Sequence, residues 1–465
     1  MNIYAPLCWP CVTIFPNNIL RKTNMMNSSE FKKRRKQLMQ RIGKGNIALI
    51  SSAGVRTRNR DVDYPFRQDS DFYYLTGFNE PDALAVFIPG RERGEYILFC
   101  REFDENKALW EGAHAGLEGA TGQYGADDAF PIEDIDDIVS GMLENKTKVF
   151  YPMGRDTDLD HRLQEWLRHI RSQSRSGVVA PAELASIEPV LHEMRLFKST
   201  VEIKLMRHAA QVSAQAHCRA MQTCCAGQYE YQVEAEIVHH FMQAGLRHVA
   251  YPSIVASGKN ACTLHYTENK DKLKHGDLLL IDAGAECDHY AADITRTFPV
   301  SGKFSEPQAL LYQLVLDAQL AAIEQVQPGK PWNAAHDASV EVLTRGLVKL
   351  GLLKGSVSKL IKNEKYKAFY MHRIGHWLGM DVHDVGDYKV NQQWRPLEAG
   401  MVLTIEPGLY IPEKCKSVDK KWRGIGIRIE DDVLVTKNGH EILTNGVPKT
   451  IVDIETLMAG AKSGR

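Results

Sequence analysis

A run of apolar residues that ends on an acid occurs twice in this chain, and it constrains the fold more than any other feature. Residues 276–284 read GDLLLIDAG and residues 400–408 read GMVLTIEPG. In both copies the carboxylate, Asp282 or Glu406, lies six positions after the first glycine and two before the second. Short apolar runs of this kind predict buried β-strands, so we expect two related strands that each end on an acid.

Each copy is followed by a second β-rich run that holds another acid. Gly284 and the polar residues 286–288 predict a turn, after which Asp293 lies inside the second strand of a β-hairpin. Residues 426–435, GIRIEDDVLV, hold Glu430 in a similar setting. The apolar flanks argue against a solvated face, because Asp has a low strand preference. Four acids that point inward together are too many negative charges to bury without metal.

Three histidines, His372, His376 and His383, lie within residues 371–384, MHRIGHWLGMDVHD. The first two are four positions apart and would share one face of a helix, but two glycines weaken a helix, so a strand or loop is predicted. A lone histidine is more often a core or surface residue than a ligand. Three of them in a chain with four buried acids favour a functional site, and His265, in TLHYTE, is a fourth candidate.

Four carboxylates and one histidine form a ligand set that suits divalent ions such as Mn²⁺, Co²⁺ or Zn²⁺. A structural zinc site would need more histidines, or thiolates. Two ions about 3.5–4 Å apart, bridged by carboxylates, would match a two-metal hydrolase.

The 465 residues suggest at least two domains, and the formal net charge of −1 gives no reason to expect nucleic acid or an anionic membrane as a partner. The nine cysteines are scattered and odd in number, so we expect a reducing, cytoplasmic compartment. No apolar run approaches 18 residues, so no transmembrane helix is expected.

Three segments are predicted. Residues 1–25 form a disordered tail or precede the true start at Met25 or Met26, residues 26–195 form an α/β domain, and residues 196–465 form a second domain. In the α/β domain, helices are expected at Phe31–Ile42 and Asp158–Arg171, and strands at Ile47–Ser51, Phe72–Leu75, Ala83–Ile88, Tyr96–Cys100 and Lys148–Tyr151.

The second domain shows helix pairs that alternate with the hairpins. Ser199 and Glu202 form a capping box, which predicts that a helix begins there and runs to about Cys224. Further helices are expected at Tyr229–Ala244, from Ser305 to about Gln327, and at 333–350 with Gly346 as a weak point. This order predicts a pseudo-twofold α/β domain with the acids on a curved central sheet.

The order Asp282, Asp293, His376, Glu406, Glu430 resembles the five metal ligands of the pita-bread metallopeptidases, which include aminopeptidase P, prolidase and methionine aminopeptidase. Residues 372–384 are similar at every position to the signature of the proline-peptidase branch. Residues 64–81 resemble the N-terminal domain of that branch. The resemblance covers about residues 27–460 and is strongest to bacterial aminopeptidase P.

The resemblance implies a role for each ligand position. Asp282 would hold one metal, His376 and Glu406 the other, and Asp293 and Glu430 would bridge the two, most simply two Mn²⁺ ions. A hydroxide between the ions would attack the carbonyl before a proline at position two of a peptide.

It also implies roles around the metals. His265 and His383 would donate to the oxyanion, and His372 would line the proline side. Arg428 and Thr295 share a strand face with Glu430 and Asp293 and could support them. Asp61, Trp110 and Tyr410 match positions near the site, although Trp110 could also be core. Asp61 and Trp110 would act across a subunit contact in a homo-oligomer, a dimer or tetramer.

Three alternatives share the fold. Non-catalytic binding modules typically lose metal ligands and creatinase works without metals, whereas this chain keeps all five positions. Prolidase, which cleaves X-Pro dipeptides, remains as the alternative activity, but it needs a cation for the dipeptide carboxylate. Arg373 is expected to point away from the proline ring, and Arg428 to be partly neutralised by Glu430 and Asp431. We therefore expect an aminopeptidase.

Overall fold

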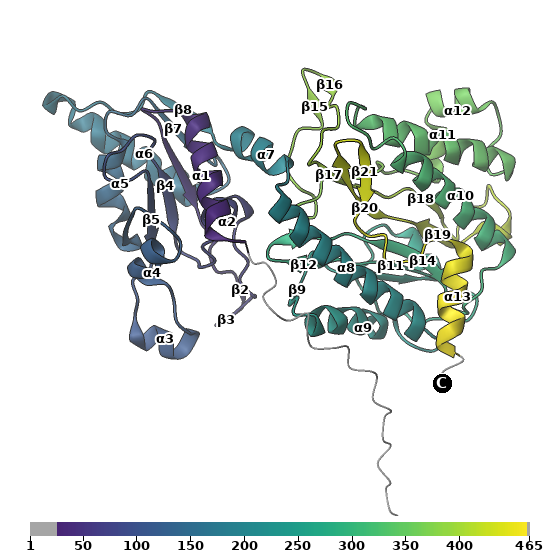
Figure 1. Cartoon of the computed structure of the whole chain (residues 1–465). Helices are drawn as coiled ribbons and strands as arrows, with labels where there is room; N and C mark the ends of the chain where they lie inside the picture. Colours follow the sequence, from purple (N-terminus) through teal and green to yellow (C-terminus); the bar gives the residue numbers. More distant parts are fainter. Residues whose placement is uncertain (1–25, 463–465) are drawn as a thin grey trace, which may run out of the picture.

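A six-stranded mixed sheet organises the first part of the chain (Figure 1). The structure, a computed structural model, describes residues 26–462, so the predicted tail 1–25 lies outside the described residues. The strand order is β6-β5-β4-β1-β7-β8, in which β4 pairs antiparallel with both neighbours and the other pairs are parallel. The strands are β1 (Ile47–Ser51), β4 (Leu84–Phe87), β5 (Tyr96–Cys100), β6 (Asp128–Pro131), β7 (Lys148–Tyr151) and β8 (Glu183–Ser186).

Helices cover both faces of this sheet, which explains why its central strands are apolar throughout. In β1, Ile47 and Leu49 pack with the cluster that includes α5 and α6, whereas Ala48 and Ile50 pack with α1 and α2. A strand buried on both faces reads as a continuous apolar run. The helices of this part are α1 (Ser28–Ile42), α2 (Ser70–Thr76), α3 (Glu105–Glu111), α4 (Gly116–Gly122), α5 (Ile135–Leu143), α6 (Thr157–Ser172) and α7 (Glu188–Leu196); a small hairpin consists of β2 (Thr57–Asn59) and β3 (Val62–Asp63).

The predicted strand at Phe72–Leu75 is wrong, because these residues lie in helix α2. Asp69 caps the helix by accepting a hydrogen bond from the Phe72 N–H, and Gly77 ends it in a left-handed conformation. All seven residues of α2 are buried. A fully buried helix has no exposed polar face, so its sequence lacks the 3.6-residue alternation of polar and apolar residues. Its aromatic residues then resemble those of a buried strand.

Helix pairs alternate with short antiparallel sheets in the second part, as predicted. Helix α8 packs against α9, and α10 packs against α11. The capping boxes at Ser199 and Ser305 are both present. Gly346 does not break its helix: a Cβ there would lie 2.2 Å from Leu314, so the glycine permits close packing of α10 on α11. The helices are α8 (Thr200–Thr223), α9 (Glu230–Gln243), α10 (Glu306–Ile323), α11 (Asn333–Lys349), α12 (Val357–Lys362) and α13 (Ile451–Lys462).

Two long hairpins lie between these helices, and each is interrupted where its acids lie. In the first, β11 pairs with β14 and β12 with β13; in the second, β17 pairs with β20 and β18 with β19. The strands of the second part are β9 (His248–Val249), β10 (Ile254–Ser257), β11 (Leu278–Asp282), β12 (Ala285–Cys287), β13 (Tyr290–Ala291), β14 (Thr295–Pro299), β15 (Lys389–Val390), β16 (Gln393–Trp394), β17 (Val402–Ile405), β18 (Gly408–Ile411), β19 (Ile425–Arg428), β20 (Asp431–Thr436) and β21 (Gly439–Ile442).

The interruptions correct two details of the predicted first hairpin. Asp293 lies between β13 and β14 and not inside a strand, and Glu430 lies likewise between β19 and β20. The turn is not made by residues 284–288, because Ala285–Cys287 form strand β12. It is made by Asp288 and His289, whose φ angles of 47° and 68° fit a two-residue type I′ turn.

Glycines at matching positions confirm that the two hairpins are related. Gly276 and Gly400 have φ angles of +95° and +99°, a region that favours glycine. Gly284 and Gly408 have no space for a side chain: a Cβ would lie 1.7 Å from the Ala292 carbonyl oxygen in the first case and 2.9 Å from the Ile427 carbonyl oxygen in the second. The repeat thus conserves backbone geometry as well as the acids.

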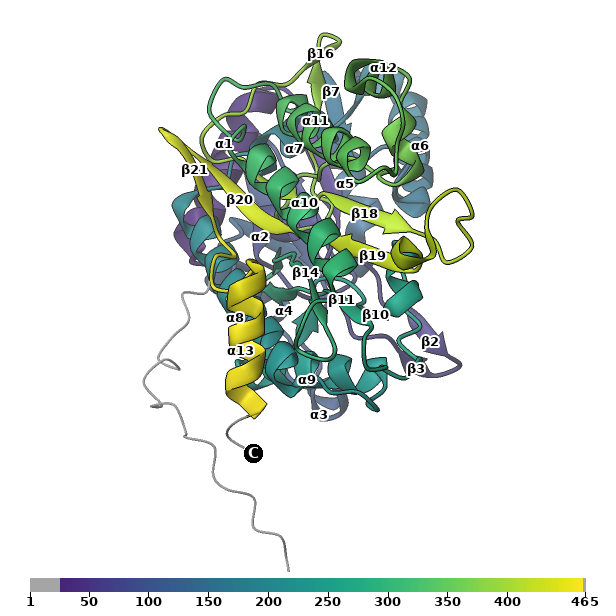
Figure 2. The ribbon, with the colours of Figure 1, turned by 90° about the vertical axis from the view of Figure 1, so that its right-hand side faces the viewer.

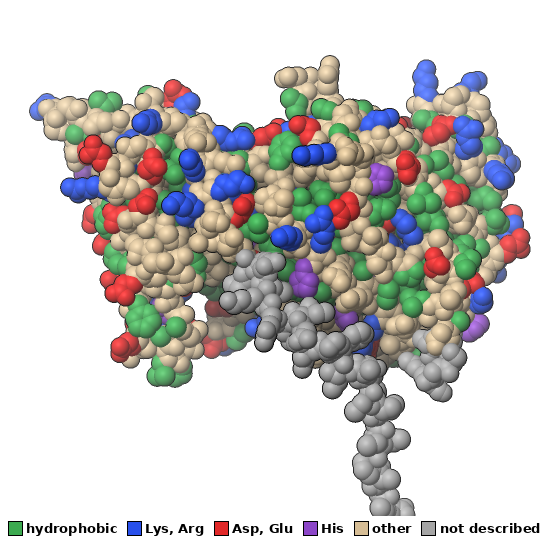
Figure 3. All heavy atoms as spheres, viewed as in Figure 1, with side chains coloured by type: hydrophobic (Ala, Val, Ile, Leu, Met, Phe, Trp, Pro, Cys, Tyr) green, Lys and Arg blue, Asp and Glu red, His purple; other side chains and the backbone are tan. Residues whose placement is uncertain are grey.

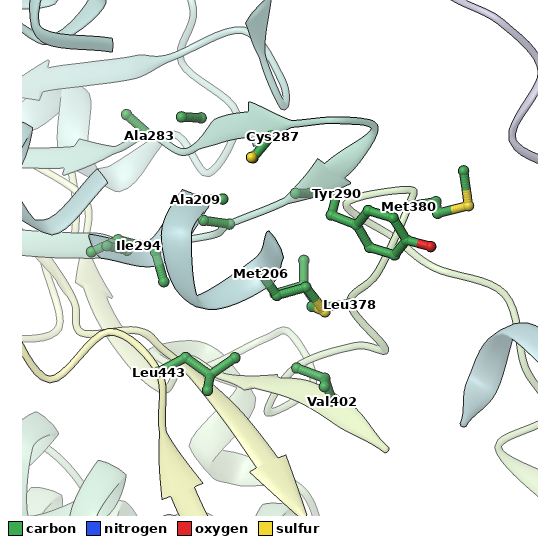
Figure 4. Close-up of a cluster of buried hydrophobic side chains, with 14 of the residues drawn as sticks. Met206, Ala209, Ala283, Cys287, Tyr290, Ile294, Leu378, Met380, Val402 and Leu443 are labelled. Carbon is green, nitrogen blue, oxygen red and sulfur yellow. The ribbon is translucent and has the colours of Figure 1, made fainter. Parts of the chain in front are cut away.

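The core of the second part lies between α8 and the hairpins. Met206 and Ala209 of α8 belong to one buried cluster with Ala283, Cys287 and Tyr290 of the first hairpin (Figure 4). On the other side, α10 contacts β17, β18 and β19, and α13 packs against α8 and α10 (Figure 2). The hairpins are therefore packed between helices on both sides. This packing fixes the position of the acids that lie where the hairpin strands are interrupted.

On the face in Figure 3, basic and acidic side chains are interspersed. No helix among residues 26–462 has the length and apolar character needed to cross a bilayer.

We predict that Gly284→Ala lowers stability, because its methyl group would overlap backbone atoms that cannot move aside as a side chain can. Overpacking of this kind costs about 1–3 kcal/mol or more. Gly141→Ala is the matched control, since it lies in helix α5 with nothing within 4 Å of the added Cβ. Thermal melting should show a lower Tm for Gly284→Ala and an unchanged or higher Tm for Gly141→Ala; equal melting temperatures would contradict the steric argument.

Candidate active site

A cavity of about 350 Å³ brings together most of the side chains predicted from the sequence. It lies where the interrupted hairpins meet residues 371–384, which form a loop, as expected. The predicted site residues that line it are His265, Asp282, Asp293, His372, His376, His383, Glu406, Arg428 and Glu430.

The centre of the cavity has the geometry of a metal site. Ligand atoms of Asp293, His376 and Glu430 all lie within 4.8 Å of one another. His376 Nε2 lies 3.4 Å from Asp293 Oδ2 and 3.6 Å from Glu406 Oε1. Asp282 reaches the same centre through a tyrosine hydroxyl that it shares with Asp293. All five predicted ligands thus converge.

Backbone and hydroxyl hydrogen bonds hold these side chains in place. The Glu430 N–H donates to the Thr295 carbonyl at 3.0 Å, and the Thr295 hydroxyl donates to Glu430 Oε2 at 2.7 Å. On the opposite side, the His376 N–H donates to Thr404 Oγ1 at 3.1 Å. Gly375 permits this contact, because a Cβ there would lie 2.0 Å from the Thr404 carbonyl oxygen.

Burial and mutual repulsion make the acids reluctant to ionise. Burial, and then the charge of Asp282, raise the pKa of Asp293; burial also raises the pKa of Glu406 to about 7, and that of Glu430 well above its usual range. Burial alone would lower the pKa of His376. The hydrogen bond to Asp293 and the negative charges of Glu406 and Asp293 outweigh the effect of burial and raise this pKa to about 9. The cavity holds more negative charge than its cations neutralise, so this donor set fits divalent ions.

Tyr251 is a site residue that the sequence reasoning missed. Its hydroxyl donates to Asp282 Oδ1 at 2.7 Å and contacts Asp293 Oδ1. Burial and these two carboxylates raise its pKa well above the usual range, so it stays a neutral donor. Tyr251 precedes β10 in a segment without periodicity, and nothing in its local sequence separates it from a core tyrosine.

Arg428 is engaged by a different acid from the ones expected. Its Nη2 donates to Asp282 Oδ2 at 2.6 Å and its Nε donates to Thr295 Oγ1 at 3.1 Å. Asp431, the expected partner, instead binds Arg296 and Lys449 below the cavity, each at 2.7 Å. The strand is interrupted after Arg428, so the simple alternation of side chains does not continue to Asp431.

The other histidines lie around the acids in distinct settings. His372 Nε2 lies 2.9 Å from the Tyr410 hydroxyl, and burial, with the charge of Arg428, lowers its pKa to about 4. The His383 ring lies 4.3 Å from the His376 ring, and burial, followed by the charge of His376, lowers its pKa. Both are neutral at pH 7. Tyr410 does not line the cavity but holds His372 from behind.

Besides Tyr410, two predicted residues lie outside the cavity of this chain. Asp61 is exposed between β2 and β3, and Trp110 is 87% exposed on α3, so the interpretation of Trp110 as a core residue is wrong. Arg373 does line the cavity, with its guanidinium 5.6 Å from the ring centroid of Trp394.

Sequence comparisons place this site in a known class. Residues 204–437 match the profile "Metallopeptidase family M24" and residues 31–151 match "Aminopeptidase P, N-terminal domain". The chain belongs to metallopeptidase family M24, whose members use divalent metal ions.

Within this family the chain is similar to Xaa-Pro aminopeptidases. It is 45% identical to the Xaa-Pro aminopeptidase of Haemophilus influenzae, over 92% of this chain and 97% of that protein. The solved structure of Pseudomonas aeruginosa aminopeptidase PepP is 56% identical, with a TM-score of 0.94 over 94% of this chain and 99% of that one. Zn-substituted Escherichia coli Aminopeptidase P, in complex with product, is 43% identical, with a TM-score of 0.92 over 94% and 99% of the two chains.

We predict that the metal-free protein loses stability as the pH rises from 7 to 9. His376 titrates near 9 in the folded state against 6.5 for the ordinary side chain, so the folded state binds more protons than the unfolded chain and each increase in pH favours unfolding. Below about 6.5 the buried histidines whose pKa is lowered to about 4 act in the opposite sense, so the prediction is confined to the higher interval. Melting temperatures should fall across this range, and Mn²⁺ should remove most of the fall because the ions replace the protons. A Tm that rises with pH would contradict this account.

Proposed function

We propose that the protein is a metal-dependent aminopeptidase that releases the N-terminal residue from peptides with proline at the second position. The observation that carries this proposal is the convergence of four carboxylates, of which Asp293 and Glu430 are buried, and His376 in one cavity next to three further histidines. Relatives of this chain are named Xaa-Pro aminopeptidases, and a variant of the E. coli enzyme has been solved in complex with substrate.

The residues that would hold two divalent ions follow from the cavity. Asp282 would bind one ion, His376 and Glu406 the other, and Asp293 and Glu430 both, with Mn²⁺ as the proposed metal. The ions would act as Lewis acids that polarise the carbonyl before the proline. Tyr251 and Thr295 orient Asp282, Asp293 and Glu430 through hydroxyl groups and leave the carboxylate charges available.

The neutral histidines would bind the substrate and the developing oxyanion. His265 and His383 would donate N–H groups to the carbonyl oxygen, where negative charge develops as the bond breaks. His372, held by Tyr410 and by the Arg373 carbonyl at 2.7 Å, would line the proline side. Arg428 would orient Asp282 through its hydrogen bond.

The chemistry suits an X-Pro bond. That bond is a tertiary amide without an N–H, so a peptidase cannot recognise it by that donor. A site that holds the carbonyl oxygen and the free N-terminal amine does not need the missing donor.

We predict that Asp293→Asn or Glu430→Gln abolishes activity and lowers the metal content, because each removes a carboxylate from the centre of the site. The measurements are release of alanine from Ala-Pro-Ala and elemental analysis of the purified variants. Metal-stripped wild type should be inactive and should recover with Mn²⁺. Full activity in the stripped protein would end the proposal of a metallopeptidase.

We predict that Ala-Pro-Ala is a better substrate than Ala-Pro by at least about tenfold in kcat/KM. A dipeptide carboxylate that enters without a cation partner loses several kcal/mol, and each 1.4 kcal/mol is tenfold. Arg428 is occupied by Asp282, but Arg373 lines the cavity and favours prolidase as the second candidate. The variant Arg373→Met distinguishes the aminopeptidase from the prolidase. If kcat/KM falls for Ala-Pro but not for Ala-Pro-Ala, Arg373 binds the dipeptide carboxylate. A preference of wild type for Ala-Pro would move the assignment to prolidase.

Four wider properties complete the proposal. The domain boundary falls at residues 195–196, the protein works in the cytoplasm, and it forms a dimer or tetramer. Asp61 and Trp110 reach a neighbouring subunit's cavity, which fits their exposure on β2–β3 and α3 outside the cavity of their own chain.

A further inference from the structure

A cluster of ion pairs, buried except for the side chain of Asp381, joins the first part of the chain to the loop that carries the site histidines. Arg195 of α7, 3% exposed, lies at its centre (α7 is the helix between the two parts in Figure 1). Its Nη1 donates to Asp71 Oδ1 of α2 at 2.8 Å, and its Nη2 donates to Asp381 Oδ2 at 2.7 Å and Asp384 Oδ1 at 2.6 Å. Lys198 Nζ donates to Asp384 Oδ2 at 2.9 Å. We call these five residues the Arg195 cluster.

Further contacts tie α2 and the residues before it to the same stretch of loop. The Ser70 hydroxyl donates to Asp381 Oδ1 at 2.6 Å, and Arg67 Nη2 donates to the Met380 carbonyl at 2.7 Å. Arg155 Nη1 donates to Asp71 Oδ2 at 3.1 Å and so fixes the acid from the far side. Both side chains and backbone of loop residues 380–384 are therefore held by the first part of the chain.

His383 lies between the two anchored acids and depends on them for its position. No residue in 26–462 forms a hydrogen bond with its imidazole ring. The ring packs against the His376 ring, with the two ring centroids 4.3 Å apart. The ring is thus placed by its backbone, which is fixed on one side by Asp381 and on the other by Asp384.

His376 on the same loop is held differently. Its N–H donates to Thr404 Oγ1 at 3.1 Å, its carbonyl accepts from the Thr404 N–H at 2.9 Å, and its Nδ1 lies 3.0 Å from the Trp377 carbonyl. These contacts all lie within the second part. The loop therefore has two separate supports, one for the metal-site histidine and one for His383.

We propose that Asp71 and Arg195 are positioning residues for the peptidase reaction: the Arg195 cluster sets the place of His383 over the cavity, so that the first part of the chain controls turnover without touching substrate. The inference rests on the proposed role of His383 as a donor to the oxyanion. A misplacement of about 1 Å at such a donor costs on the order of a hundredfold in rate. The N-terminal part is in this sense a component of the active site.

The test is a double-mutant cycle on the full-length, metal-loaded protein with Asp71→Asn and His383→Ala. Asp71→Asn keeps the size of the side chain but removes the charge that binds Arg195. We expect it to lower kcat about tenfold or more, with KM and metal content unchanged. In the His383→Ala background it should have no further effect, because the residue that it positions is gone. Ser70→Ala removes the hydrogen bond from a neutral hydroxyl to Asp381 and should give a smaller loss of kcat in the same pattern. It replaces Asp71→Asn in the cycle if that variant folds poorly.

Glu193→Gln is the matched control. Glu193 lies on the same helix α7 and forms a bidentate pair with Arg395 at 2.7 and 2.8 Å that does not reach the histidine loop. It should leave kcat unchanged even if the Tm falls.

Three results with the Asp71→Asn and Glu193→Gln variants would overturn the inference. Asp71→Asn could leave kcat unchanged, it could lower kcat equally in both backgrounds, or Glu193→Gln could lower kcat as much. Full activity of His383→Ala would remove both the proposed role of His383 and this inference. If His383→Ala lowers kcat as expected but Asp71→Asn does not, the proposed role of His383 stands and only this inference fails.

Discussion

Burial of negative charge at the ends of β11 and β17 is the constraint on which the rest of this structure depends. Burial and the charges of neighbouring acids raise the pKa of Asp293, Glu406 and Glu430. Hydroxyl groups contact three of the site acids: Tyr251 contacts Asp282 and Asp293, and Thr295 contacts Glu430. Cationic partners are fewer, since Arg428 binds Asp282 and His376 lies beside Asp293 and Glu406. A hydroxyl orients a carboxylate without neutralising it, so the site keeps its charge for cations.

The fold meets this constraint with interrupted hairpins clamped between helices. Each strand stops at or next to an acid, which frees the side chain from the alternation of a regular strand. The backbone then approaches other backbone closely, and glycines make this possible. Gly284 faces the Ala292 carbonyl, and Gly375 lets the histidine loop pack on Thr404. The geometry of the site therefore depends on these glycines as well as on the acids.

The sequence predicted the parts of this structure that leave periodic or repeated traces. The capping box at Ser199, the alternation of helix pairs with hairpins, and the convergence of four acids with His376 all follow from such patterns. The failures have a common cause, since each depends on contacts remote in sequence. Helix α2 has no polar face because both parts of the chain bury it, and Tyr251 acquires its role only when β10 lies beside the first hairpin. Asp431 is turned to Arg296 by an interruption that local alternation cannot reveal.

The twofold repeat is broken in one respect. Asp282 and Glu406 occupy equivalent positions, but a histidine, His376, stands beside Glu406 only, whereas Asp282 has Tyr251 and Arg428 as neighbours. An ion beside Glu406 must displace a proton from a histidine that titrates near 9, while an ion beside Asp282 competes with an arginine that never deprotonates. The two halves, alike in backbone, therefore surround their acids with different competitors for a cation, a proton on His376 in one half and the guanidinium of Arg428 in the other.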